Sequence, residues 1–164
     1  MDIRPGELRD LPRLTEIYNY YVRNSPATFD LYPFSVAERQ EWFDHYHRDG
    51  PHRLLVACSG ADILGYATSS QFRVKPAYDT SVETTVYCDP TATGRGVGTA
   101  LYTALFKQLA SDDVHRAFAG IVPPNDASIA LHKRFGFTEI GIFPEVGRKF
   151  GRYWDVLWLW RPIP

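Results

Sequence analysis

Apolar side chains recur at helical spacing in two segments near the start of the chain. Asp10 precedes the first segment, at a position where it can cap a helix. The apolar face of this predicted helix consists of Leu11, Leu14, Ile17, Tyr18, Tyr21 and Val22. Ser35 and Glu38 form a capping-box pair that opens the second helix, which we expect to end at Gly50. Its inward face consists of Trp42, Phe43 and Tyr46.

Runs of β-branched and aromatic residues predict the strands. A short strand at residues 3–5 precedes the helices. Residues 53–59 and 63–72 form two strands that Gly60-Ala61-Asp62 joins as a hairpin. The later strands are predicted at residues 80–88, 117–122, 140–143 and 155–160. The order of these elements predicts one α/β (α+β) domain over residues 1–164, with a central mixed sheet and helices on both faces.

A glycine-rich segment, Thr93-Gly94-Arg95-Gly96-Val97-Gly98-Thr99, separates the strand that stops at Asp89-Pro90 from the next helix. That helix has apolar positions at Leu101, Leu105, Phe106 and Leu109. Glycines let the backbone approach an anion closely, and a helix N-terminus adds bare N–H groups and the positive end of a dipole. The spacing fits neither the GxGxxG fingerprint nor a P-loop. It therefore leaves open both a phosphate site and a plain glycine turn.

A second candidate segment follows the strand at residues 117–122. Asn125 or Asp126 caps a short helix that stops at Gly136. His132 lies in this helix among apolar neighbours, which are Ile129, Leu131 and Phe135. This setting suits a half-buried histidine with satisfied hydrogen bonds as well as a functional one.

Three charged residues in and before the strand at residues 80–88 are candidates for a functional role. Glu83 stands among β-branched residues, where either a solvent-facing position or a functional carboxylate explains it. Arg73 and Lys75 are two residues apart, so in an extended segment they share a face, and Tyr78 follows closely. A solvated loop explains the same pattern.

The composition excludes several classes of protein. A chain of 164 residues that is 45% apolar can bury a core. The net charge is −1 and the sequence has no basic run, so the charge pattern does not indicate binding to nucleic acid or to a membrane surface. Since no signal peptide or bilayer-length apolar run is evident, we expect a cytoplasmic protein.

Cys58 and Cys88 suit reduced core residues. The remaining histidines form no metal-ligand set, so we expect no metal; they are His45, His47, His52 and His115.

Several segments together resemble the GNAT superfamily of N-acetyltransferases. The residues similar to its acetyl-CoA motif are Val86-Tyr87-Cys88-Asp89-Pro90, Thr93-Gly94-Arg95-Gly96-Val97-Gly98 and Leu101. The residues similar to its second coenzyme-contacting segment are Asn125-Asp126-Ala127-Ser128, His132 and Phe135-Gly136-Phe137. A resemblance to the phosphinothricin acetyltransferase branch is carried by Tyr18-Asn19-Tyr20-Tyr21, Ala77-Tyr78-Asp79, Val82-Glu83-Thr84-Thr85-Val86-Tyr87 and Gly147-Arg148-Lys149-Phe150-Gly151. Matches extend from Ile3 to Trp158.

The resemblance implies a GNAT fold, whose mostly antiparallel central sheet splays open next to the acetyl-CoA loop. The pyrophosphate of coenzyme A would then lie on the backbone amides of residues 95–99. The implied coenzyme-binding residues are Val86, Tyr87, Cys88, Arg95, Gly96, Val97, Gly98, Thr99, Asn125 and Ser128. Thr93 departs from the family, which has Gln or Arg there; because backbone N–H groups hold the phosphate, we expect at most a modest loss of affinity.

The resemblance also implies direct acetyl transfer to the α-amine of a small acidic amino acid, such as phosphinothricin or methionine sulfone or sulfoximine. Glu83 is the implied general base, because an amine attacks a thioester only in its neutral form. A backbone N–H near Tyr87 would stabilise the oxyanion. His132 is implied as either an acid for the departing thiolate or a substrate contact. The implied substrate-binding residues are Phe29, Arg73, Lys75, Tyr78 and Tyr102.

The same branch implies a homodimer. Residues 153–160 are apolar enough to form its surface, although alternation in a core strand explains the same pattern. Two other functions stay open at this point. One is a GNAT enzyme that acetylates a different amine, such as a protein N-terminus, a polyamine or an aminoglycoside. Arg73 and Lys75 argue against a cationic substrate. The other is a non-catalytic acyl-CoA-binding protein, against which Glu83 argues.

Overall fold

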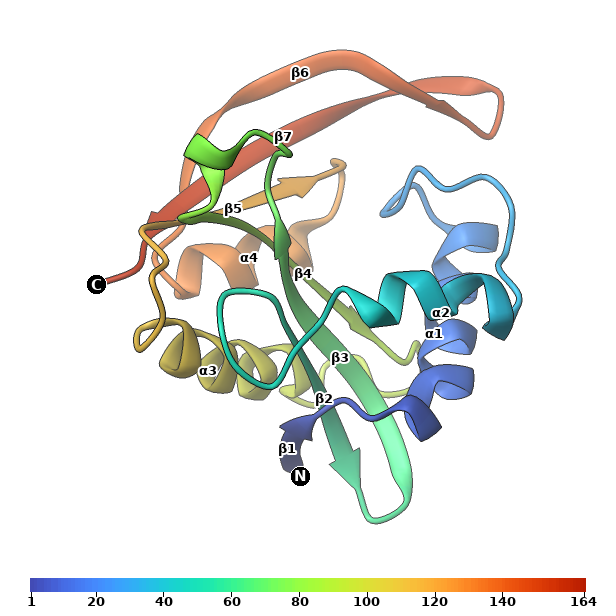
Figure 1. The fold of residues 1–164 in the computed structure, drawn as a ribbon. Coiled ribbons are helices and arrows are strands. Elements are labelled where there is room, and N and C mark those ends of the chain that lie inside the picture. Colours follow the sequence, from blue (N-terminus) through green and yellow to red (C-terminus); the bar gives the residue numbers. More distant parts are fainter.

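A computed structural model describes residues 1–164, and its centre is a seven-stranded sheet with the order β1-β2-β3-β4-β5-β7-β6 (Figure 1). The strands are β1 (Asp2–Pro5), β2 (Arg53–Ser59), β3 (Asp62–Gln71), β4 (Ser81–Cys88), β5 (Arg116–Ile121), β6 (Thr138–Lys149) and β7 (Arg152–Pro162). The helices are α1 (Leu11–Asn24), α2 (Val36–Asp44), α3 (Val97–Leu109) and α4 (Asp126–Arg134). Two short 3₁₀ helices cover Leu8–Asp10 and Pro76–Tyr78.

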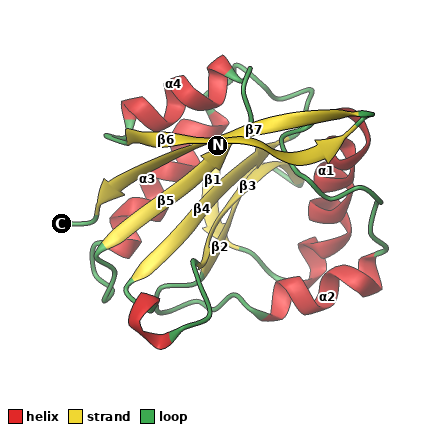
Figure 2. Ribbon diagram, turned by 90° about the horizontal axis from the view of Figure 1, so that it is seen from above, coloured by secondary structure: helices red, strands yellow, loops and turns green.

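Helices cover both faces of the sheet, as the sequence predicts. Figure 2 shows α3 and α4 on one side of the strands and α1 and α2 on the other. On the α3 side, the largest apolar cluster includes Leu101, Leu105 and Val82. On the α1 side, a smaller cluster includes Ile17 and Tyr66. No helix is both long and apolar enough to cross a lipid bilayer.

The sheet opens between β4 and β5, which is its one parallel pair. The ladder between these strands joins residues 81–83 to residues 116–118 and then stops at the pair of Glu83 and Phe118. β4 nevertheless continues to Cys88 while remaining paired with β3 on its other side. The expectation of a mostly antiparallel sheet that splays open next to the glycine loop is therefore confirmed, and the structure places the start of the opening at Glu83.

The predicted end of the second helix at Gly50 is wrong. α2 ends at Asp44, and the N–H of His45 closes its last turn on the carbonyls of Trp42 and Phe43. The chain then turns back toward β2, with the N–H of His47 donating to the carbonyl of His52 at 2.9 Å. Gly50 lies inside this turn at φ +85°. The glycine marks a left-handed turn position, not the end of the helix.

Asp10 occupies the N-cap position of α1, but its side chain does not cap that helix. Its carboxylate accepts two hydrogen bonds from the Arg4 guanidinium, at 2.7 and 2.8 Å, and one from the Glu7 N–H at 2.8 Å. These charge-assisted bonds hold the carboxylate over the preceding 3₁₀ turn and away from α1. Ser35, in contrast, caps α2 together with Glu38 as predicted.

The C-terminal hairpin is longer than its two predicted strands at residues 140–143 and 155–160. β6 is solvent-exposed along most of its length and contains Gly141, Pro144 and Gly147, so no buried face imposes an alternating pattern on the sequence. The hairpin arches over one side of the molecule in Figure 1. Lys149 ties β6 to the loop after α1, since its Nζ donates to the carbonyls of Ser25 and Thr28 at 2.7 and 2.8 Å.

Candidate active site

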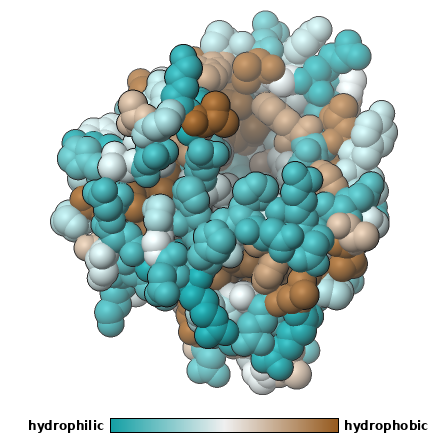
Figure 3. All heavy atoms as spheres, in the orientation of Figure 1, coloured by the Kyte–Doolittle hydropathy of each residue, from teal (hydrophilic) through white to brown (hydrophobic).

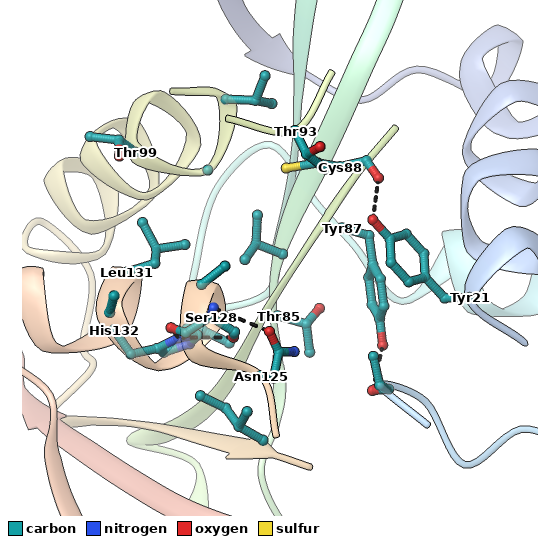
Figure 4. Close-up of a pocket in the computed structure, with 18 of the residues that line it drawn as sticks. Tyr21, Thr85, Tyr87, Cys88, Thr93, Thr99, Asn125, Ser128, Leu131 and His132 are labelled. Atoms are coloured by element: carbon teal, nitrogen blue, oxygen red, sulfur yellow. Dashed lines mark hydrogen bonds between the residues drawn. The ribbon is translucent and has the colours of Figure 1, made fainter. Parts of the chain in front are cut away.

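A cleft with a cavity volume of about 620 Å³ lies where β4 and β5 diverge (Figure 4). Its walls are the second half of β4, the glycine loop with the start of α3, the end of β5, and α4. The predicted coenzyme residues that line it are Val86, Tyr87, Cys88, Gly96, Val97, Gly98, Thr99, Asn125 and Ser128. Arg95 is exposed and does not line the cleft.

The glycine loop places the N-terminus of α3 at this cleft. Gly94 and Gly96 have φ values of +74° and +76°, which glycine adopts without the strain of a Cβ atom. Gly96 is the N-cap and has no side chain to accept from the first turn, so no side chain of the N-cap occupies the N–H groups at the start of α3, which borders the cleft. At Gly98, a Cβ atom would lie 3.0 Å from the Cδ2 atom of Leu131, so glycine keeps α3 and α4 close.

Thr93 lines the cleft without pointing a free donor into it. Its hydroxyl donates to the carbonyl of Pro90 at 3.3 Å, within the same loop. Asp89 fixes the start of that loop, because its carboxylate accepts from the N–H and the hydroxyl of Thr91 at 2.7 and 2.6 Å. Arg13 forms an ion pair with the same carboxylate and so joins α1 to the end of β4.

His132 is buried at the floor of the cleft with both ring nitrogens engaged. Its Nδ1 donates to the carbonyl of Ser128 at 2.7 Å, because a carbonyl oxygen only accepts. Its Nε2 lies 2.9 Å from the Tyr102 hydroxyl. Burial lowers the pKa of His132, which favours the neutral ring, so Nε2 accepts from Tyr102. The one proton of this imidazole is therefore already committed to Ser128.

A second cavity, of about 510 Å³, lies on the other face of β4, against α1 and α2. Glu83, Thr85 and Tyr87 line it from alternate positions of β4. Thr85 and Tyr87 also line the cleft, so the two cavities meet along this stretch of strand. In Figure 3 the face of the molecule is hollowed between the β6–β7 hairpin above and α2 below.

Glu83 is half-buried in the wall of this second cavity. Burial raises the pKa of its carboxyl group above the ordinary range, because a charged carboxylate loses hydration there. The positive charge of Arg73 acts in the opposite direction and lowers that pKa. A carboxylate with a raised pKa in the wall of a cavity has the properties of a general base.

The other predicted substrate residues do not converge on Glu83. Arg73, Lys75 and Tyr78 are exposed on the connection between β3 and β4 and line neither cavity. The segment is not extended as far as expected, because residues 76–78 form a 3₁₀ turn. The Arg73 guanidinium stacks 4.2 Å from the centre of the Phe72 ring, and of the three only Arg73 affects the pKa of Glu83.

Phe29 and Tyr102 also lie outside both cavities. The Phe29 ring packs on Gly147 of β6, where a Cβ atom would come within 2.3 Å of its Cε2 atom. Tyr102 is 0% exposed on α3, which covers the face of β4 opposite to Glu83. Tyr102 therefore does not line the second cavity.

The cavity beside Glu83 is instead lined by residues that the sequence analysis did not select for binding, among them Arg39, Asp30 and Tyr46. The sequence nevertheless contains a pattern that could have identified Arg39. It lies three residues before Trp42, so both residues share the inward face of α2. A charged residue on an otherwise aromatic inward face is a marker of a lined cavity.

Comparison with known proteins places this geometry among acetyltransferases. The family model described as Acetyltransferase (GNAT) family matches residues 14–137. The chain is 57% identical to a phosphinothricin N-acetyltransferase from Streptomyces coelicolor, over 99% of this chain and 96% of that protein. It is similar to a phosphinothricin acetyltransferase from Sinorhizobium meliloti solved with acetyl-CoA, with a TM-score of 0.93, 33% identity and coverage of 99% and 88%. A ribosomal-protein-alanine N-acetyltransferase from Brucella melitensis has a TM-score of 0.94, 36% identity and 99% coverage of each chain.

Proposed function

The chain belongs to the acetyltransferase (GNAT) family, and on that premise we propose that it acetylates the α-amine of a small amino acid with an acidic side chain, using Glu83 as general base. The observation that carries this proposal is the meeting of the two cavities at Thr85 and Tyr87. One cavity suits a coenzyme, and the other presents a carboxylate with a raised pKa.

The cleft between β4 and β5 fits acetyl-CoA. The left-handed glycines and the uncapped N-terminus of α3 suit a pyrophosphate, for which Gly96 to Thr99 provide backbone N–H groups. Beyond Glu83, β4 has no ladder partner on the β5 side, so its polar backbone groups there are free to pair with a pantetheine arm. Acetyl-CoA supplies the activated acetyl group, and this chain supplies the orientation.

Glu83 accepts the proton that the acceptor's ammonium group must lose. The neutral amine then forms a C–N bond with the acetyl carbon, the C–S bond breaks, and coenzyme A leaves as a thiolate that takes up the second proton lost by the nitrogen. A backbone N–H near Tyr87 stabilises the developing oxyanion. We assign His132 a positioning role through Tyr102, because its own proton is donated to the Ser128 carbonyl.

The acceptor class follows from the relatives and from charge. Phosphinothricin appears in the names of two of the similar proteins, and it is an amino acid with a second acidic group. Arg73, whose charge lowers the pKa of Glu83, is a candidate counter-charge for such a group. The similarity to a ribosomal-protein-alanine acetyltransferase makes a peptide N-terminus the second candidate acceptor.

Release of free thiol from acetyl-CoA tests the proposal directly. The acceptors are phosphinothricin, L-methionine sulfone, a peptide with an N-terminal alanine, and spermidine. We expect turnover with the first two and at least a hundredfold lower kcat/KM with the others. Faster acetylation of the peptide would replace the substrate assignment, and no turnover with any amine would exclude the enzymatic function.

We also propose that the protein is a homodimer through the exposed apolar side chains of the β6–β7 hairpin. Six large apolar side chains of this hairpin are 49% to 57% exposed; they are Ile140, Ile142, Phe143, Val146, Phe150 and Tyr153. Apolar side chains gathered in this way mark interaction surfaces on soluble proteins. Sedimentation of the protein and of Ile142→Lys tests this; a monomeric wild type would contradict it, and the variant should shift the dimer toward monomer.

A further inference from the structure

Arg39 on α2 is a buried cation without a partner in the protein. Its side chain faces the cavity that contains Glu83, and the residue is only 5% exposed. The guanidinium carbon lies 3.7 Å from the centre of the Trp42 ring and 4.2 Å from that of Tyr18. Its Nε and Nη2 atoms have no hydrogen-bond partner, and none of the ion pairs includes it.

The two aromatic rings hold the guanidinium but leave its hydrogen bonding unsatisfied. Stacking on ring faces stabilises a cation, yet ring faces cannot accept the in-plane N–H groups of the guanidinium. Buried charges in proteins are normally both paired and hydrogen-bonded, because loss of hydration is otherwise uncompensated. An arginine stacked in this way is pre-organised for a planar anion such as a carboxylate.

The two acidic groups that line this cavity do not pair with Arg39. Asp30 lines the same cavity, and its carboxylate accepts a hydrogen bond from the Tyr18 hydroxyl. Glu83 lines the cavity from β4, and the charge that acts on its pKa is that of Arg73. The cavity thus has a base on its β4 wall and an unpaired cation on its α2 wall.

We propose that Arg39 binds the α-carboxylate of the acceptor and so selects free amino acids over peptide N-termini and simple amines. This inference rests on the proposed function, because it assumes an amino acid in the cavity. A zwitterionic amino acid presents its ammonium group to Glu83 and its carboxylate to Arg39. In a peptide, a neutral amide replaces that carboxylate, so the charge of Arg39 has no counter-charge.

The test compares L-methionine sulfone with its α-carboxamide, which keeps the amine and the side chain. For wild type and each variant, the ratio of kcat/KM for the acid to that for the amide is measured. We expect Arg39→Gln to lower this ratio by about 10- to 100-fold, the range for a hydrogen bond to a charged group, mainly through KM of the acid. Arg39→Lys, which keeps the charge without the planar fork, should lower it less. Arg48→Gln removes an exposed arginine outside both cavities and should leave the ratio unchanged.

A purely structural Arg39 gives a different result. Arg39→Gln would then reduce kcat/KM for the acid and for the amide by the same factor, which would overturn the proposal. If Arg39→Gln does not fold, Arg39→Lys decides in the same way, since an unchanged ratio in that variant excludes bidentate recognition of the carboxylate.

A binding measurement separates this inference from the proposed function. The shift in Tm that L-methionine sulfone causes is measured without coenzyme, so it needs neither Glu83 nor acetyl transfer. We expect a shift for wild type with the acid, none with the amide, and none for Arg39→Gln with the acid. If wild type shows this pattern but acetylates no amino acid, the proposed function fails and the Arg39 site stands. If acid and amide shift the Tm of wild type equally, the Arg39 site fails.

Discussion

Glu83 on β4 pairs with Phe118 on β5, and this is the last pair of the parallel ladder between the two strands. The carboxylate therefore stands at the point where the sheet opens. Residues before Glu83 hold the two strands together, and residues after it line the cleft. Because side chains alternate along a strand, the Glu83 side chain faces the second cavity, while the backbone that follows it borders the cleft between β4 and β5. The proposed base therefore lies two residues before Thr85, where the two cavities meet.

Replacement of Glu83 by Gln should abolish most of the activity. We expect kcat/KM at neutral pH to fall on the order of 10²-fold or more, since no other carboxylate of β4 can take the proton. Steady-state kinetics with phosphinothricin measures this. Glu139→Gln removes an exposed carboxylate on β6 and serves as the matched control. Full activity of Glu83→Gln would exclude Glu83 as the base.

The same variant should be more stable than wild type at neutral pH. Because the pKa of Glu83 is higher in the folded state than in the unfolded state, ionisation at neutral pH opposes folding. This cost is fully present above the folded-state pKa and is lost as the pH falls below the ordinary pKa of glutamate. Thermal unfolding should therefore show a higher Tm for Glu83→Gln at pH 7 and equal values near pH 3. A lower Tm at pH 7 would contradict the burial of this charge.

Arg73 should set the acid limb of the pH profile. The base is active when deprotonated, so kcat/KM rises with pH through the pKa of Glu83. Arg73 lowers that pKa, and Arg73→Gln should therefore move the acid limb to higher pH. Because Arg73 is exposed, the displacement should shrink as salt is added. Arg152→Gln, on the tip of the β6–β7 hairpin, is the control; an identical acid limb in all three proteins would contradict the electrostatic effect of Arg73 on Glu83.

Replacement by alanine should have different effects at Gly96, in the loop before α3, and at Gly60, in the turn between β2 and β3. Gly96 and Gly60 have φ values of +76° and +61°, and a Cβ atom on either would meet no other atom within 4 Å. Alanine at each position should cost about 1 kcal/mol of stability from backbone strain alone. Only Gly96→Ala, at the N-terminus of α3, should also raise KM for acetyl-CoA. Urea unfolding and coenzyme titration measure both effects, and equal KM values would argue against the loop as the phosphate site.

Lys149 should contribute more to stability than any exposed lysine. It is 4% exposed, and its Nζ bridges the carbonyls of Ser25 and Thr28 across a long stretch of sequence. Lys149→Met leaves two carbonyls without a charged donor, so we expect a loss of about 2 kcal/mol in urea unfolding. Lys107→Met on the exposed side of α3 should change the stability by less than about 0.5 kcal/mol. Equal losses would show that the Lys149 bridge is not formed in solution.

The coenzyme side of the site follows from contiguous sequence. β4, the glycine loop and α3 are consecutive, so the order of strand, glycines and helix already places the N–H groups, and nearly all the residues selected for the coenzyme line the cleft. Arg95 is the exception, because it lies on the outer side of a turn whose direction the two left-handed glycines set. The end of α2 and the role of the Asp10 side chain were misjudged for a related reason. Their signals in the sequence were real, but hydrogen bonds within the neighbouring turns used these residues differently.

The acceptor side required the tertiary structure. Its walls come from α1, α2, β3 and β4, and no spacing rule states which side chains of separate elements meet. Glu83 could be selected as a candidate from the sequence, because a carboxylate is unusual among the β-branched residues of its strand. Arg39 was not selected, and Tyr102 was expected near the substrate, because only the packed sheet decides which face of β4 each helix covers. Sequence alone thus determined the fold family and the glycine loop before α3, which depend on local order. The lining of the cavity beside Glu83 depends on long-range packing, and only the three-dimensional structure decided it.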